Sequence, residues 1–296
     1  VIVQLKKKEL KEKLQANKDD KFSYSLDKLF EYMGRDQVLG IPGTGYENEI
    51  QDITASQLYQ YLLKCIREDV KHVYVVGDFQ ENIVKIFQEN LQFPQNQQNY
   101  LSSYTFESPR AEVLEVIEKQ DITQSKLNLG YTIDCDFTSK NHYAFTVFNA
   151  LFGGFSQSRL FQVVREQNSL CYYISSSYDA FNGVMLVNVG IETQDYQKTL
   201  NLIEQQLSDL KNGHIQDEEI AIAKMMLKNA LKKTNDEASS MIALAYNRDI
   251  TGIHETNEEY IEKLMNVTLE EIVQVAQNVK LDTIYFLTGK EFHENY

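Results

Sequence analysis

The chain has 296 residues, 43% of them apolar and 24% charged, which is typical of a globular protein with one large domain or two of moderate size. Its formal net charge of −14 argues against nucleic acids and anionic membrane surfaces as partners, because both are bound through an excess of Lys and Arg. An acidic exterior fits cationic peptides, although solubility alone is the commoner reason for it.

The N-terminal stretch VIVQLKKKELKEKLQ does not have the charge order of a signal peptide, and no apolar run approaches the roughly 18 residues of a membrane helix. The chain opens with Val inside a helical pattern, which suggests a fragment or a processed chain. Cys65, Cys135 and Cys171 show no CxxC spacing, so we expect a reducing, cytoplasmic location and no disulfide framework. Cys171 reads as a small buried strand residue or, alternatively, as a reactive thiol.

Two parts of the chain, Leu10–Phe79 and Leu227–Lys290, repeat one order of elements: two helices, a third helix opened by Thr, and an apolar strand. Thr54 and Thr268 stand where an N-cap belongs, each before apolar residues at helical spacing. The apolar runs of HVYVVGDF and TIYFLTGK predict one buried strand in each copy. The repeat therefore indicates a duplicated domain.

The second copy has a front part that the first copy lacks. Alternation and helical spacing predict, in order, strands at 111–120 and 124–137, helices at 141–151 and 158–165, a hairpin of 171–178 with 183–191 around Asn182-Gly183, and helices at 194–210 and 217–232. We expect a corresponding front part to have preceded Val1. Residues 1–88 are then the back of a first half, 89–110 a linker rich in Gln, Asn and Ser, and 111–296 a complete second half.

The sequence contains few motifs that carry chemistry. Its five histidines never form the HxxEH pattern that binds zinc, and GxSxG, P-loop and GxGxxG motifs do not occur. Arg165 and Tyr172 lie seven residues apart across a predicted helix end and the next strand, a connection that brings a guanidinium and a phenol to one edge. Both groups donate hydrogen bonds suited to an oxyanion or a peptide carbonyl. A salt-bridged Arg beside a core Tyr is the structural alternative.

The stretch LFGGFSQSRLFQVVREQNSLCYY (151–173) resembles the non-zinc half of the M16 metallopeptidases, the pitrilysin, insulinase and mitochondrial processing peptidase family. The Gly pair, SRLF, and the Arg and Tyr of REQNSLCY match in the right order, and the likeness covers essentially the whole chain. The resemblance implies an α+β fold of duplicated LuxS-like metallohydrolase halves, with an antiparallel sheet packed against helices and the first half incomplete.

The resemblance also implies roles for single residues. In active M16 enzymes one half holds zinc through HxxEH and a downstream Glu, and the other half contributes an Arg and a Tyr that contact the substrate. Arg165 and Tyr172 match that pair, and Gly153 and Gly154 match the glycine loop that meets substrate. Tyr173 is the alternate tyrosine, although a strand should turn it away from Tyr172. Arg159 is assigned to positioning the helix.

Three functions fit this resemblance. The first is a non-catalytic subunit that supplies Arg165 and Tyr172 to peptide binding opposite a zinc-bearing M16 half, similar to two-subunit members of Gram-positive bacteria. The second is a fragment of a self-contained zinc endopeptidase whose HxxEH lies before residue 1. The third is a scaffold of M16 fold with a vestigial pair. Zinc is expected only in a partner half or a missing N-terminal part, and the chain alone is expected to be inactive.

Overall fold

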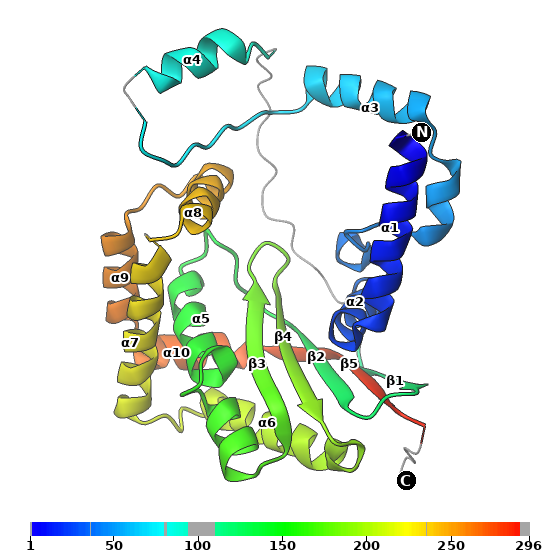
Figure 1. Cartoon of the computed structure of the whole chain (residues 1–296). Coiled ribbons are helices and arrows are strands. Elements are labelled where there is room, and N and C mark those ends of the chain that lie inside the picture. Colours follow the sequence, from blue (N-terminus) through cyan, green and yellow to red (C-terminus); the bar gives the residue numbers. More distant parts are fainter. Residues whose placement is uncertain (1, 36, 80–81, 94–109, 235, 291–296) are drawn as a thin grey trace. The chain divides into compact units, whose positions relative to one another are not determined.

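The computed structural model describes residues 2–35, 37–79, 82–93, 110–234 and 236–290. Helices and strands follow in the order α1 (Ile2–Asp19), α2 (Lys21–Gly34), α3 (Ala55–Glu68), α4 (Ile83–Asn90), β1 (Leu114–Gln120), β2 (Ser125–Thr132), α5 (Asn141–Asn149), β3 (Cys171–Asp179), β4 (Val184–Ile191), α6 (Tyr196–Lys211), α7 (Asp217–Thr234), α8 (Ala238–Thr251), α9 (Asn257–Asn266), α10 (Leu269–Gln277) and β5 (Lys280–Gly289) (Figure 1). Shorter turns are the 3₁₀ segments η1 (Val38–Gly40), η2 (Glu47–Asp52) and η5 (Thr193–Asp195) and the π-helical segments η3 (Ala150–Gly154) and η4 (Leu160–Gln167). In these ranges no helix has both the length and the apolar character needed to span a bilayer.

The chain folds into two compact units. The sheet unit comprises residues 17–43, 103–231 and 255–296, and the helical unit comprises 1–16, 44–102 and 232–254. The division predicted from the repeat, 1–88, 89–110 and 111–296, concerns descent from a duplicated domain and stays a prediction. Residues 94–109 of its linker lie outside the described residues.

The sheet unit is built on one five-stranded sheet in the order β1-β5-β2-β4-β3. β2 pairs antiparallel with both β4 and β5, and β3 pairs antiparallel with β4. β1 pairs with β5 in parallel, so the sheet is mixed at one edge. The predicted strands at 111–120 and 124–137 both form, but β5 lies between them. The predicted hairpin of β3 and β4 also forms, with Gly183 at φ +67° in its turn.

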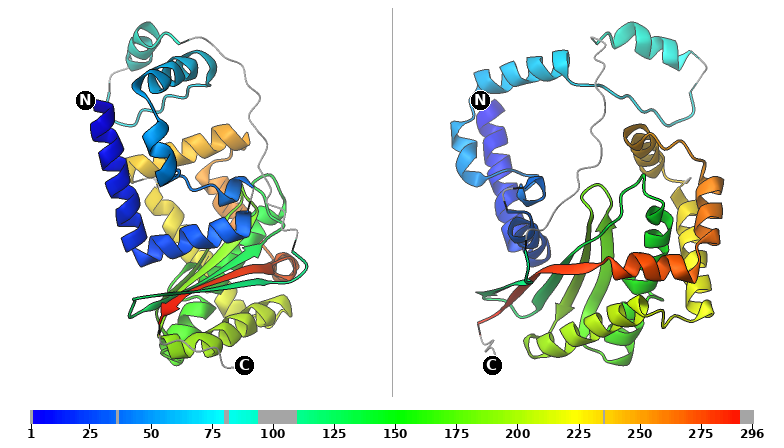
Figure 2. Two further views of the ribbon diagram at one scale, coloured as in Figure 1. Left: turned by 90° about the vertical axis from the view of Figure 1, so that its right-hand side faces the viewer. Right: turned by 180° about the vertical axis from the view of Figure 1, so that it is seen from behind.

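Helices cover both faces of this sheet (Figure 2). Alternate strand residues such as Leu127, Val187 and Phe286 point into one large core. Helices α5, α6 and α10 form the other side of this core, with Phe148 from α5 and Ile272 from α10. All five of these side chains are fully buried. The α+β class and the packing of the sheet against helices are therefore as predicted.

Helix α2 covers the opposite face of the sheet. Its residues Leu29 and Met33 are fully buried, and Leu29 packs with Tyr285 and Leu287 of β5. The Tyr32 ring stacks on the Tyr285 ring with 5.9 Å between centroids. β2 leaves space for this helix at Gly130, where a Cβ atom would lie only 2.7 Å from the Met33 Sδ.

The third helix of each predicted repeat copy begins as expected, but the two helices differ in burial. Thr54 and Thr268 each form a capping box at the start of α3 and α10. Ile272, four residues after its cap, is fully buried in the sheet unit. Leu58 and Leu62 of α3, which occupy the corresponding face, are exposed within the helical unit. The same apolar pattern therefore lies against a core in one copy and not in the other.

The strand predicted at His72–Phe79 does not form, and this part of the prediction is wrong. A strand needs a neighbouring backbone that accepts and donates hydrogen bonds, and every strand of the described sheet belongs to the sheet unit. The segment instead contacts α8: the Tyr74 hydroxyl donates to the Asp249 carboxylate at 2.5 Å, and the Tyr74 and Tyr246 rings meet edge to face at 6.2 Å.

Candidate functional site

The sequence-predicted site lies on one continuous stretch of the sheet unit, from η3 through η4 into β3. π-helical turns of this kind are frequent at functional sites. Leu160 and Val164 anchor η4 because both are fully buried in the main core. Arg159 is bound to α7, with its Nε 2.8 Å from Glu219 Oε1 and one Nη 2.8 Å from Glu219 Oε2. This contact gives Arg159 the positioning role predicted for it.

The two predicted glycines differ in their surroundings. Gly153 is buried against β3, where an added Cβ would lie 2.7 Å from the Ser176 backbone nitrogen and 2.6 Å from its Oγ. Ser176 also donates a 2.7 Å hydrogen bond to Asn149, which ties the same turn to the strand. Gly154 is exposed, and its nearest neighbour would be the Asn149 carbonyl oxygen at 3.0 Å. Gly153 thus permits close packing, and Gly154 is the glycine that a ligand could approach.

Tyr172 protrudes because β3 carries a bulge at this residue. Cys171 pairs with Ile191 and Tyr173 pairs with Gly190, so Tyr172 is the extra residue without a ladder partner. Such a bulge redirects a side chain away from the regular alternation. Tyr172 is 55% exposed, and its hydroxyl donates a hydrogen bond to the carboxylate of Glu192. That hydrogen bond to a negative group raises the pKa of Tyr172, so the phenol stays protonated, and a ligand would replace Glu192 as the acceptor of its one proton.

Arg165 lies in the last turn of η4, the element that packs on β3 next to Tyr172. Its guanidinium carbon is 4.6 Å from the centroid of the Phe161 ring, and its Nε is 3.8 Å from Glu166 Oε1. The side chain is 40% exposed, so the guanidinium reaches water and any ligand there. Arg165 and Tyr172 are therefore two exposed hydrogen-bond donors on neighbouring elements. Contacts with Phe161 and Glu166 hold the Arg165 side chain, and Glu192 holds the Tyr172 side chain.

Tyr173 takes a different position from Tyr172. Its ring lies over Gly190, where a Cβ would come within 2.3 Å of the ring, and meets the Phe22 ring of α2 edge to face at 5.7 Å. Its hydroxyl is buried and has no hydrogen-bond partner among the described residues. Burial raises the pKa of Tyr173 to about 12. The side chain faces α2 as strand alternation predicts, and its predicted role in substrate binding has no exposed donor to support it.

Cys171, between the two site residues, is half-buried. Burial raises the pKa of its thiol to about 11, although the nearby Arg165 charge opposes this shift. A protonated thiol is a poor nucleophile at neutral pH. The structure therefore favours the prediction of a small packing residue over that of a reactive thiol.

The described residues do not form a metal site. No group of three or more His, Cys, Asp or Glu side chains in the described ranges comes together as ligands for an ion. His142, the histidine nearest the site in sequence, lies instead among aromatic rings, with its Nε2 3.3 Å from the Tyr260 hydroxyl and the Phe137 centroid 5.1 Å away. The described residues therefore do not fit the HxxEH zinc set of the active half.

Burial of His142 predicts that the stability of the fold decreases at acidic pH. The ring is 7% exposed, and desolvation lowers its pKa below the usual 6.5, although the charges of Glu255 and Asp136 oppose the shift. The unfolded chain therefore takes up this proton before the folded chain does. The unfolding free energy should then fall as the pH drops below about 6.5.

Urea unfolding of wild type and His142→Phe at pH 5.5 and pH 7.5 measures this contribution. The variant should lose less stability than wild type between these pH values, because Phe carries no proton. His214→Gln, a change at an exposed histidine, should behave like wild type. Equal pH dependence in all three proteins would contradict the prediction.

Comparison with known proteins identifies the family. A family model described as the Peptidase M16 inactive domain matches residues 52–227, which include η3, η4 and β3. The chain belongs to the M16 peptidase family. Its relatives in Bacillus subtilis include the "Probable inactive metalloprotease YmfF", 33% identical over 96% of this chain, and the "Uncharacterized zinc protease YmxG", 24% identical over 81%. The chain spans 67% and 59% of the lengths of these two relatives.

Solved structures share the fold of this chain. A conserved protein from Enterococcus faecalis V583 is 34% identical and superimposes with a TM-score of 0.88 over 99% of this chain and 69% of its own. The M16 inactive domain from Pseudomonas fluorescens reaches a TM-score of 0.79 over 99% of this chain and 72% of its own at 14% identity, so this likeness concerns the fold alone. The predicted M16 resemblance and fold are confirmed.

Sequence reasoning missed Glu192, the acceptor for the Tyr172 hydroxyl. The signal was present in the hairpin, because a turn at Asn182-Gly183 brings the end of β4 beside the start of β3. The bulge at Tyr172 leaves no comparable mark in the sequence. Glu192 holds the phenol of Tyr172 at the start of β3.

Proposed function

We propose that this chain is a non-catalytic M16 subunit that binds peptide with Arg165 and Tyr172 opposite a zinc-bearing half, in the cytoplasm. The observation that supports the proposal is the presentation of two exposed donors by neighbouring elements, η4 and the bulge of β3. A guanidinium and a protonated phenol stabilise negative charge that develops on a peptide carbonyl oxygen. Gly154, exposed in the preceding turn, leaves the backbone open to the same peptide.

Simple measurements distinguish this proposal from two alternatives. In a self-contained endopeptidase, zinc would be bound by a part of the protein that precedes residue 1, and the catalytic motif would be found there. In a scaffold of M16 fold, the donors would be exposed without affecting peptide turnover. The 33% identity to the relative named "Probable inactive metalloprotease YmfF" supports the subunit over the first alternative.

The test combines this chain with a purified zinc-bearing M16 half and a fluorogenic peptide. Arg165→Ala and Tyr172→Phe are each expected to slow cleavage by about 10²-fold, the effect of losing one donor to an oxyanion. The chain alone is expected to contain no stoichiometric zinc and to cleave nothing. The measurements are initial rates and zinc content by mass spectrometry.

Matched controls come from the neighbouring residues. Tyr173→Phe removes a buried hydroxyl that has no partner among the described residues, and Gln167→Ala shortens an exposed side chain of η4; both should leave the rate within about twofold. If Arg165→Ala and Tyr172→Phe cleave as fast as these controls, the scaffold alternative stands. Stoichiometric zinc in the chain alone would overturn the subunit proposal.

A further inference from the structure

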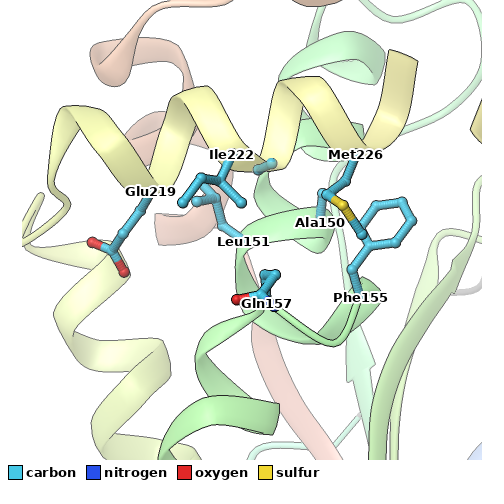
Figure 3. Close-up of a pocket in the computed structure, with 8 residues that line it drawn as sticks. Ala150, Leu151, Phe155, Gln157, Glu219, Ile222 and Met226 are labelled. Carbon is cyan, nitrogen blue, oxygen red and sulfur yellow. The ribbon is translucent and has the colours of Figure 1, made fainter. Parts of the chain in front are cut away.

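A small cavity opens between the glycine turn and helix α7. It encloses about 40 Å³ and lies wholly within the sheet unit. Figure 3 shows Leu151 and Phe155 of the turn facing Ile222 and Met226 of the helix, with the Met226 sulfur directed toward the Phe155 ring. The full set of lining residues is Ala150, Leu151, Phe155, Gln157, Glu219, Ile222, Ala223 and Met226. We call this space the α7 cavity.

The chemistry of the α7 cavity is apolar. Six of its eight lining side chains are aliphatic, aromatic or thioether groups. Glu219 contributes the one carboxylate, but Arg159 binds both of its oxygens at 2.8 Å and the Gln216 backbone N–H donates to it at 2.8 Å. With its charge paired and its oxygens already bonded, Glu219 is a poor ligand for a cation. The cavity therefore selects by shape and apolar contact.

The size of the cavity limits its occupant. A space of about 40 Å³ accommodates about three water-sized groups, each of which needs roughly 10–15 Å³ on this measure. Three or four carbon atoms correspond to the side chain of Val or Leu, whereas an aromatic ring is larger. Gln157, exposed at the rim, offers an amide that can bond the main chain of a ligand.

The cavity also lies against a turn of the proposed peptide site. Its near wall is the turn that contains Gly154, and the next element, η4, carries Arg165. The net charge of −14 disfavours an acidic occupant. We propose that the α7 cavity receives one aliphatic side chain of the bound peptide and so gives this subunit a preference for Val or Leu at one position. The proposal rests on the proposed function in that the peptide is the one that meets Arg165 and Tyr172.

The test uses small probes, so that it does not depend on Arg165, Tyr172 or a partner. The full chain, labelled with ¹³C at the methionine methyl groups, is titrated with N-acetyl-leucinamide and with N-acetyl-aspartate amide. Met226 lines the cavity, and its neighbour Met225 is 53% exposed outside it. N-acetyl-leucinamide should shift the Met226 resonance saturably, with a Kd in the millimolar range, and leave Met225 unchanged. The acidic probe should bind at least about tenfold more weakly.

Matched variants identify the binding place. Ala223→Leu fills the cavity and should abolish the Met226 response, whereas Ala221→Leu, the same change at an exposed position of α7, should preserve it. Thermal unfolding checks that both variants are folded. The inference is overturned if N-acetyl-leucinamide does not shift the Met226 resonance of the wild-type protein, or if both probes shift it equally.

The outcomes also separate the two proposals. If the probe binds and cleavage is insensitive to Arg165→Ala and Tyr172→Phe, the α7 cavity stands and the proposed function fails. If the probe does not bind and those variants slow cleavage by about 10²-fold, the function stands and the cavity is not its specificity site.

Discussion

Arg110→Met is expected to lower the unfolding free energy of the sheet unit by about 3–5 kcal/mol, the range for removing one partner of a buried ion pair. The Arg110 and Asp282 side chains are 7% and 3% exposed, and they meet at 2.8 Å. Arg110 also donates to the Thr283 hydroxyl at 3.0 Å and to the Tyr32 carbonyl at the end of α2. The substitution therefore removes the cation beside the buried Asp282 carboxylate. It also removes the hydrogen bonds through which Arg110 connects the end of α2 to β5.

Chemical denaturation measures the effect, with the loss of tyrosine fluorescence as the signal. Lys28→Met is the matched control, since it removes a cation from an ion pair on α2 whose partner Glu31 is 58% exposed. Exposed pairs contribute about 0–1 kcal/mol, so this variant should unfold close to wild type. Equal losses in both variants would show that the burial of the Arg110–Asp282 pair has no energetic consequence.

Gly153→Ala is expected to destabilise the sheet unit by about 3 kcal/mol, at the upper end of the range for overpacking. The new Cβ would lie 2.7 Å from the Ser176 backbone nitrogen, closer than real contacts allow. Because backbone cannot rotate away as a side chain does, η3 must move off β3, and the Ser176–Asn149 hydrogen bond is strained with it.

Gly154→Ala is the control for this prediction, because its nearest contact would be 3.0 Å and it lies at the surface. We expect a loss below about 1 kcal/mol for Gly154→Ala. Circular dichroism melts compare the two variants with wild type. Identical melting temperatures would show that the turn moves away from β3 without cost.

Local chemistry explains which parts of the fold could be predicted. The hairpin at Asn182-Gly183 needs a residue at positive φ, and the helix starts at Thr54 and Thr268 need a side-chain oxygen for free N–H groups. These requirements act over a few residues and are visible in the sequence. The insertion of β5 between β1 and β2 depends on pairing between distant segments, which leaves no local pattern.

The failed strand at His72–Phe79 shows the limit of the apolar pattern. Its residues have the composition of a buried strand, as do those of β5. β5 forms because β1 and β2 supply backbone partners on both sides, whereas His72–Phe79 has no adjacent strand among the described residues of the helical unit. An apolar run therefore predicts the capacity to form a strand, and a neighbour decides the outcome.

The candidate site was predicted in part. The family-like spacing in REQNSLCY pointed to Arg165 and Tyr172, and both are exposed on adjoining elements. Strand alternation predicted different directions for Tyr172 and Tyr173, but the bulge that makes Tyr172 protrude could not be predicted. The packing role of Gly153 and the hydrogen bond from Tyr172 to Glu192 depend on close three-dimensional contacts and could not be read from the order of residues.

The position of α2 on the sheet has a consequence for folding during synthesis. Helix α2 is made before any strand of the sheet, and its partner β5 is made after all the others. Glu118 bonds Tyr24 of α2 across 94 residues and Tyr285 of β5 across 167 residues. Contacts of such long sequence separation form slowly because a large loop must close first. Leu29 on the apolar side of α2 therefore stays exposed to water until β5 has been synthesised, and the sheet unit completes its folding only then.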